Sequence, residues 1–271
     1  MKEIGIEKRY ILRPLFASFD DTTVTSCLEG RNSSRAWADD DENPTVAKVL
    51  LGGFREGSGG FAFIAGDKNA PCVPEMIKII PEEYKGLGVI LVPPDDSWGG
   101  VIKAALGEGC KKEIRYATSK TEAHFDKEKL SEWASALDGE FELRFVDREL
   151  FSRLEDCPWS HECVGNFKNY DEFERDNGLA VACLHGDEIV GVVGSFSAYS
   201  GGIEIEIDTK EEYRRRGIAR AGAAKLILEC LERGLYPSWD AATTISLSLA
   251  KSLGYVFKNE YGSYWVKNEV K

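Results

Sequence analysis

The chain has 271 residues, of which 43% are hydrophobic, a formal net charge of −12 and an isoelectric point near 4.9. This length predicts two domains of ordinary size, each with its own core. The acidic balance argues against a nucleic-acid partner, because proteins that bind the phosphate backbone concentrate Lys and Arg.

The N-terminus and the apolar runs do not predict a secretory or membrane segment. Residues 1–9 mix both charge signs, and the longest apolar runs, such as residues 87–94, are shorter than the roughly 20 residues that span a bilayer. The seven cysteines are scattered and odd in number, which favours free thiols in a reducing compartment. We therefore expect a cytoplasmic protein with no membrane partner. The segment 157–163 lacks a Cys-x-x-Cys pair and a second ligand pair, so no metal site is predicted.

The first half of the chain alternates strand-like and helix-like segments, which is typical of an α/β or α+β chain. Strands are expected over residues 46–52, 61–66 and 87–92, with a glycine-rich hairpin loop over 52–60. Helices are expected over residues 97–106 and 121–137, where Ser97 and Thr121 are candidate N-caps.

The second half begins with a turn over residues 137–139. Residues 139–146 alternate apolar and charged side chains, which predicts a strand with one buried face. We therefore place a boundary here, with domains over residues 1–138 and 139–271. Further on, helices are expected over residues 147–154 and 170–177, a hairpin over 179–184 and 189–196, and a strand over 203–207.

A basic segment follows that strand in an otherwise acidic chain. Arg214-Arg215-Arg216-Gly217-Ile218-Ala219, which we call the basic loop, leads into a segment whose apolar residues recur with helical spacing. The first turn of a helix presents unpaired N–H groups at the positive end of the helix dipole. Gly217 and Ala219 allow a close approach of the backbone to an anion, and the arginines add positive charge. The pattern predicts an anion-binding loop, and the alternative is a solvated surface turn.

The motif Arg-x-x-Gly-x-Ala after a strand resembles the cofactor signature of the GNAT N-acetyltransferases. Residues 235–242, Leu-Tyr-Pro-Ser-Trp-Asp-Ala-Ala, and a later Leu253-Gly254-Tyr255 agree with the same family. The resemblance implies a C-terminal GNAT fold, a mixed, mostly antiparallel sheet flanked by helices, preceded by a smaller N-terminal α/β domain. It also implies an acyltransferase that uses acetyl-CoA as co-substrate and holds no metal.

The resemblance also implies which residues contact the cofactor. Backbone groups of Ile207, Asp208 and Thr209 would align the pantetheine arm. The pyrophosphate would lie on the basic loop, Arg214, Arg215, Arg216, Gly217, Ile218 and Ala219. Thr243 stands where the family commonly has an asparagine that reaches the pantetheine, and Ser246 lies in the helix that follows.

Within the family, residues 205–209 and 237–242 are similar to the subgroup that includes the zwittermicin-resistance acetyltransferases, and shorter matches at 37–40 and 42–44 extend the resemblance toward the N-terminus. On this interpretation the N-terminal domain shapes the acceptor pocket or is a degenerate GNAT-like domain. The acceptor is a primary amine, and an aminopolyol antibiotic, a polyamine, an amino acid and a protein amine all remain open.

Two glutamates on the predicted strand are candidates for the catalytic base. Acetyl transfer needs a neutral amine, so a carboxylate or an ordered water must take the ammonium proton. Glu206 is the first candidate and Glu204 the second, and the alternative is that both lie on the exposed face of a half-buried strand. Ala250 stands where the family often has a tyrosine acid, which leaves Tyr255, Tyr261 or water as proton donor. A non-catalytic acyl-CoA-binding module is the alternative to an enzyme.

Overall fold

The structure is a computed structural model of residues 1–271, and it describes the chain apart from residues 53–58, 82–87, 108–109, 122 and 268–271. The glycine-rich loop expected over residues 52–60 therefore lies mostly outside the described residues. Within the described residues, no helix combines the length and the hydrophobicity needed to cross a membrane.

The chain divides into two compact units, Met1–Arg115 with Glu260–Lys271, and Tyr116–Asn259. The boundary expected at residue 138 therefore lies inside the second unit. The physical reason is that helix α4 (Lys127–Ala134) packs against α7 (Ile218–Glu232), which belongs to the C-terminal half of the chain.

The second unit contains a five-stranded sheet in the order β11-β10-β9-β8-β7. These strands are β7 (Phe141–Phe145), β8 (Ala180–His185), β9 (Glu188–Tyr199), β10 (Gly202–Thr209) and β11 (Tyr236–Ser238). β7 to β10 pair in antiparallel fashion, whereas β11 runs parallel to β10. The predicted hairpin and the strand after it are confirmed, and so is the mixed, mostly antiparallel sheet.

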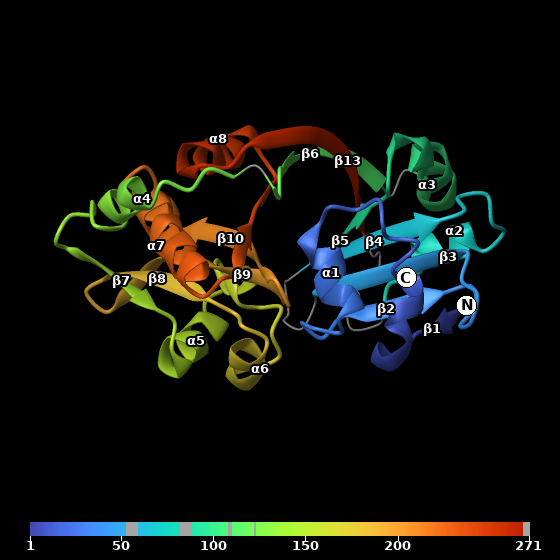
Figure 1. The fold of residues 1–271 in the computed structure, drawn as a ribbon, viewed down its shortest axis with the longest axis horizontal. Coiled ribbons are helices and arrows are strands. Elements are labelled where there is room, and N and C mark those ends of the chain that lie inside the picture. Colours follow the sequence, from blue (N-terminus) through green and yellow to red (C-terminus); the bar gives the residue numbers. More distant parts are fainter. Residues whose placement is uncertain (53–58, 82–87, 108–109, 122, 268–271) are drawn as a thin grey trace. The chain divides into compact units, whose positions relative to one another are not determined.

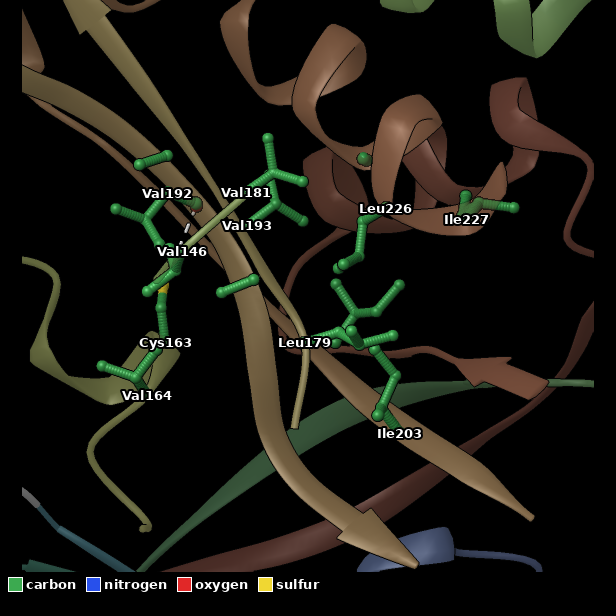
Figure 2. Packing of buried hydrophobic residues seen from close by; sticks show 14 of the residues in the cluster. Val146, Cys163, Val164, Leu179, Val181, Val192, Val193, Ile203, Leu226 and Ile227 are labelled. Atoms are coloured by element: carbon green, nitrogen blue, oxygen red, sulfur yellow. Dashed lines mark hydrogen bonds between the residues drawn. The ribbon is translucent and has the colours of Figure 1, made fainter. Parts of the chain in front are cut away.

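Both faces of this sheet are covered. α7 packs on β8, β9 and β10 (Figure 1), and Gly222 permits the close approach, because a Cβ at this position would lie 2.9 Å from Val193 Cγ2. The opposite face carries the 3-10 turn η5 (His161–Cys163), where Cys163 Sγ lies 3.8 Å from the Val192 carbonyl oxygen. Figure 2 shows Cys163 on one side of the strands and Leu226 of α7 on the other. In the middle of β9, Val193 therefore faces α7, whereas Gly194 faces η5, because a Cβ on Gly194 would lie 2.3 Å from the Cys163 carbonyl oxygen.

The helix expected over residues 121–137 is shorter than predicted. The Asp126 carboxylate accepts hydrogen bonds from the N–H groups of Glu128 and Lys129, both at 3.1 Å, so α4 begins only at Lys127. The two helices expected after β7 appear as α5 (Arg148–Glu155) and α6 (Tyr170–Arg175). The chain after β11 forms β12 (Asp240–Ala241) and α8 (Thr244–Leu253).

The first unit contains most of a sheet of order β1-β2-β3-β4-β5-β13-β6-β12, whereas β12 and the ends of β6 and β13 belong to the second unit. Its strands are β1 (Lys2–Glu3), β2 (Arg35–Ala38), β3 (Val46–Gly52), β4 (Gly60–Gly66), β5 (Gly88–Val92), β6 (Cys110–Thr118) and β13 (Phe257–Lys267). Its α-helices are α1 (Thr22–Leu28), α2 (Val73–Lys78) and α3 (Gly99–Leu106). The chain passes between the units within β6 and again within β13.

The two units repeat one order of elements. Three antiparallel strands (β2-β3-β4 or β8-β9-β10) are followed by a helix (α2 or α7), a strand parallel to the third (β5 or β11) and a second helix (α3 or α8). The first unit differs where β4 meets α2, since residues 67–72 read Asp-Lys-Asn-Ala-Pro-Cys and contain no arginine or glycine. Its α2 also has only six residues, against fifteen in α7.

Candidate active site

β10 and β11 separate within the second unit. They pair only over Gly202–Glu204 and Tyr236–Ser238, after which the chain leaves at Trp239 and β12 pairs with β6. We call the point where they separate, after Glu204 and Ser238, the fork. β10 stays paired with β9 up to Thr209, so beyond Glu204 its other edge is not paired with β11 among the described residues.

Three consecutive residues hold the β11 side of the fork. These residues are Thr118, Ser119 and Lys120. Thr118 Oγ1 donates to the Trp239 carbonyl oxygen at 2.6 Å, and the Ser119 carbonyl oxygen accepts from the Tyr236 hydroxyl at 3.0 Å. Lys120 Nζ donates to Ser238 Oγ at 2.5 Å. Each side of the fork is therefore bonded to a different strand or segment, which keeps the two strands apart.

The backbone of β10 presents hydrogen-bonding groups to the open side of the fork. The N–H of Lys210 donates to the Val190 carbonyl oxygen at 3.0 Å, and such bonds alternate along an antiparallel pair. The backbone groups of Ile207 and Thr209 therefore face away from β9, where the predicted pantetheine contacts require them. Those of Asp208 bond toward β9, so the backbone contact expected of this residue is not supported by the geometry.

The basic loop ends at an N-terminus of α7 that has no side-chain cap. Gly217 is the N-cap residue and has a φ of +86°, and Arg215 also has a positive φ of +62°. Backbone of this kind turns successive N–H groups toward one side, which favours anions, and the helix dipole adds to the effect. Within the part of the chain that the structure describes, no side chain accepts from the first-turn N–H groups of Ile218 and Ala219, as the predicted pyrophosphate contact requires.

The three arginines of the loop have different environments. Arg214 Nε donates to the Thr209 carbonyl oxygen at 3.2 Å. Arg216 forms an ion pair with Glu140, and its guanidinium lies 4.6 Å from the ring centroid of Phe141. Arg215 is exposed and bonds to no residue that the structure describes. Arg215 is therefore the arginine best able to bind an anion.

Thr243 and Ser246 both have partners inside the second unit. Thr243 is the N-cap of α8, and its Oγ1 accepts a hydrogen bond from the Ser246 N–H at 3.1 Å. Ser246 Oγ accepts a hydrogen bond from Trp239 Nε1, also at 3.1 Å. Each hydroxyl still has its own proton to donate, so a contact with the pantetheine remains a prediction.

The glutamates of β10 do not lie on an exposed polar face. Glu204 is 6% exposed, and its Oε2 accepts a hydrogen bond from Ser238 Oγ at 2.5 Å. Glu206 is half-buried, and its Oε1 accepts a hydrogen bond from the Ile207 N–H at 3.3 Å. The exposed-face alternative is wrong for Glu204, because Ser238 and its neighbours cover this side of the strand.

The tyrosines considered as acids are placed differently. Tyr255 is buried, which raises the pKa of its phenol well above the ordinary value, and its hydroxyl donates to the Pro237 carbonyl oxygen at 2.5 Å. The phenol proton of Tyr255 therefore takes part in a structural hydrogen bond, which disfavours Tyr255 as the proton donor to the thiolate. Tyr261 lies in the part of β13 that belongs to the first unit. Ala250 is fully buried.

Asp208 is the carboxyl group near the fork whose ionisation is most clearly perturbed. Its pKa is raised from 3.8 to about 6, mainly by burial and also by the negative charge of Glu162, while Arg214 opposes the shift. Cys163 Sγ lies 4.0 Å from Asp208 Oδ2, and burial raises the pKa of this thiol well above its ordinary value.

Asp208→Asn is expected to stabilise the protein at pH 7 by about 2 kcal/mol and to have little effect below pH 4. The folded protein holds the Asp208 proton up to about pH 6 whereas the unfolded chain loses it near 3.8, so stability from this group falls as pH rises between these values. Urea unfolding at pH 4 and pH 7 checks this, with the exposed Glu212→Gln as control. A stabilisation of equal size at both pH values would contradict the assignment.

The segment around Cys157 forms no evident metal site. All seven cysteines are free thiols. Among the residues that the structure describes, no group of three His, Cys, Asp or Glu side chains is placed to hold a metal ion.

Sequence reasoning missed Lys120 entirely and quoted Ser238 only as part of a motif. Nothing in the sequence pairs them, since they lie 118 positions apart. Ser238 could have been noticed as a small polar residue inside an apolar strand.

The chain is similar to known proteins over almost its whole length. The family model described as GNAT acetyltransferase matches residues 13–264. The uncharacterized N-acetyltransferase YdfB of Bacillus subtilis is 28% identical, over 98% of this chain and 98% of its own. A GCN5-related N-acetyltransferase-like protein from Streptococcus suis is 37% identical, with a TM-score of 0.85 over 96% of this chain and 100% of that one. A Drosophila protein with 15% identity and a TM-score of 0.60, over 99% of both chains, shares the fold alone.

Proposed function

This chain belongs to the GNAT acetyltransferase family, and from that premise we propose that it transfers the acetyl group of acetyl-CoA to a primary amine of a small acceptor. The observation that carries the proposal is the fork, where β10 continues beyond its pairing with β11, together with an N-terminus of α7 that has no side-chain cap among the described residues. An anionic group at the helix and an extended polar chain along the strand edge are both accommodated by this arrangement.

The residues present fit acetyl-CoA. Arg215 and the N–H groups of Ile218 and Ala219 would hold the pyrophosphate, and backbone groups of Ile207 and Thr209 would hold the pantetheine. The chemistry supplied by bound acetyl-CoA is an activated thioester. Holding both reactants at the fork would supply much of the rate through proximity.

Glu206 is the proposed base, since it is half-buried and lies just beyond the residues of β10 that pair with β11. It would accept the proton of the acceptor ammonium and leave a neutral amine. No tyrosine occupies the position of Ala250, so water is the proposed proton donor to the leaving thiolate. A non-catalytic acyl-CoA-binding module is less well supported, because two carboxylates, those of Glu204 and Glu206, lie on β10 at the fork.

The proposal extends to the first unit, the acceptor and the cellular location. The repeated order of elements supports the view that the first unit is a degenerate GNAT-like copy, and its loop lacks the arginines and glycine of the basic loop. The resemblance to zwittermicin-resistance acetyltransferases favours an aminopolyol as acceptor. The seven free thiols favour a cytoplasmic location.

A thiol-release assay tests the proposal. With acetyl-CoA and a panel of aminopolyols, polyamines, amino acids and peptide amines, we expect release of free CoA that requires both the protein and one class of amine. Gly217→Asp serves as the background control. Tight binding of acetyl-CoA without release for any amine would instead favour the binding module.

A further inference from the structure

A chain of three polar side chains, in which Ser238 and Glu204 are buried and Lys120 is half-buried, joins the two strands at the fork. Lys120 Nζ lies 2.5 Å from Ser238 Oγ, which in turn lies 2.5 Å from Glu204 Oε2. Ser238 is fully buried, and Glu204 is 6% exposed. Glu204 and Ser238 form the last register pair before β10 and β11 separate. The chain therefore lies at the closed end of the fork.

The chemistry of the three groups fixes the direction of both hydrogen bonds. An ammonium group only donates, so the Ser238 hydroxyl must accept from Lys120. The hydroxyl has one proton, which it directs to Glu204 Oε2. Hydrogen bonds donated to a carboxylate favour its charged form, and a low local dielectric strengthens such a chain.

Two other ionisable groups near Glu204 are the acidic groups of Tyr255 and Glu206. Burial raises the pKa of Tyr255, with smaller contributions from neighbouring groups that include the charge of Glu204. Glu206 lies two residues along β10, and its side chain points to the same face of the sheet. Lys120 is therefore the cation that the described contacts bring to Glu204.

A buried carboxylate is costly to keep at a position where an apolar side chain would pack more favourably. Lys120 is held in place for this contact, because Ser119 is bonded on both sides: its N–H donates to the Val256 carbonyl oxygen at 2.8 Å, and its carbonyl oxygen accepts from Tyr236. The arrangement thus favours a charged Glu204 side chain at the fork over a role in packing alone.

We propose that Lys120, acting through Ser238, keeps Glu204 as a carboxylate at the fork, and that this carboxylate binds the ammonium group of the acceptor before Glu206 takes its proton. The inference rests on the proposed function, since it assigns an acceptor-binding group to the same site. Lys120 and Ser238 are positioning residues, and Glu204 and Glu206 have separate tasks.

The test compares the full-length wild type with Lys120→Met and Lys120→Arg, using the amine found in the thiol-release panel. At pH 7, Lys120→Met should lower kcat/KM for the amine by about tenfold through KM, with kcat and the Kd for acetyl-CoA changed by less than about threefold. Lys120→Arg keeps the charge and should behave like the wild type.

The pH dependence separates this role from a structural one. The defect of Lys120→Met, expressed as the ratio of kcat/KM values, should shrink at pH 9, because a higher pH favours the charged form of a carboxyl group whether or not a lysine is present. Ser238→Ala should show the same pH-dependent defect, and Ser238→Thr should not. A ratio that is equal at pH 7 and pH 9, or a loss confined to kcat, would overturn the inference.

A readout without turnover completes the test. In NMR titrations of ¹³C-labelled full-length protein, the Glu204 carboxyl should titrate at higher pH in Lys120→Met than in the wild type, and identical curves would contradict the inference. Should Lys120→Met fail to fold, Lys120→Gln takes its place in each measurement. A wild type that binds acetyl-CoA but acetylates no amine contradicts the proposed function instead, and the titration still decides the role of Lys120.

Discussion

Replacing Gly217 with Asp should raise the Kd for acetyl-CoA by about a hundredfold or more while the fold persists. A carboxylate at this N-cap would accept hydrogen bonds from the first-turn N–H groups of α7 and so occupy the proposed pyrophosphate site with like charge. Space is available, since a Cβ on Gly217 would meet only Leu137 Cδ2, at 3.8 Å. The φ of +86° adds a modest strain, which the new cap partly offsets.

Calorimetry with acetyl-CoA and thermal unfolding measure the two halves of this expectation. Gly217→Asn is the matched control, because its side chain has the same shape and tolerates a positive φ but has no charge. It should weaken binding much less than Gly217→Asp. Wild-type affinity in Gly217→Asp would show that the phosphate assignment is wrong.

Glu206→Gln should lower kcat by about 10²–10⁴-fold, the range typical for loss of a general base, with little change in the Kd for acetyl-CoA. The amide oxygen of glutamine can keep the hydrogen bond that Glu206 Oε1 accepts from the Ile207 N–H, so the local geometry should persist. What the substitution removes is the capacity to take a proton.

Steady-state kinetics over pH 5 to 10 check this prediction. The acid limb of the wild-type profile should reflect ionisation of the base or of the acceptor amine, and Glu206→Gln should alter that limb. Glu212→Gln, on the exposed turn η6 (Glu211–Tyr213), is the control and should match the wild type. A wild-type rate in Glu206→Gln would move the base elsewhere or leave water alone in that role.

Local patterns were sufficient to predict the elements that carry the proposed cofactor site. The strict alternation over residues 203–207 predicted β10, and the basic loop with its glycine predicted the start of α7. Both signals depend on a few consecutive residues, because strand pleating and helix capping are short-range effects. The helix before β7 was predicted too long, since Asp126 competes as an N-cap well inside the apolar pattern.

The catalytic environment was decided by contacts between distant parts of the chain. The same alternation that predicted β10 predicted an exposed face for Glu204, but Ser238, 34 positions away, lies on that glutamate, and Lys120 reaches Ser238 across 118 positions. The unit boundary likewise depends on α4 packing against α7. The sequence by itself thus determined the position of the proposed anion-binding loop, because the start of a helix is a local property. Only the tertiary structure decided which carboxylate is buried, which is held by a lysine and which faces the fork, because burial and charge pairing depend on neighbours that folding brings together.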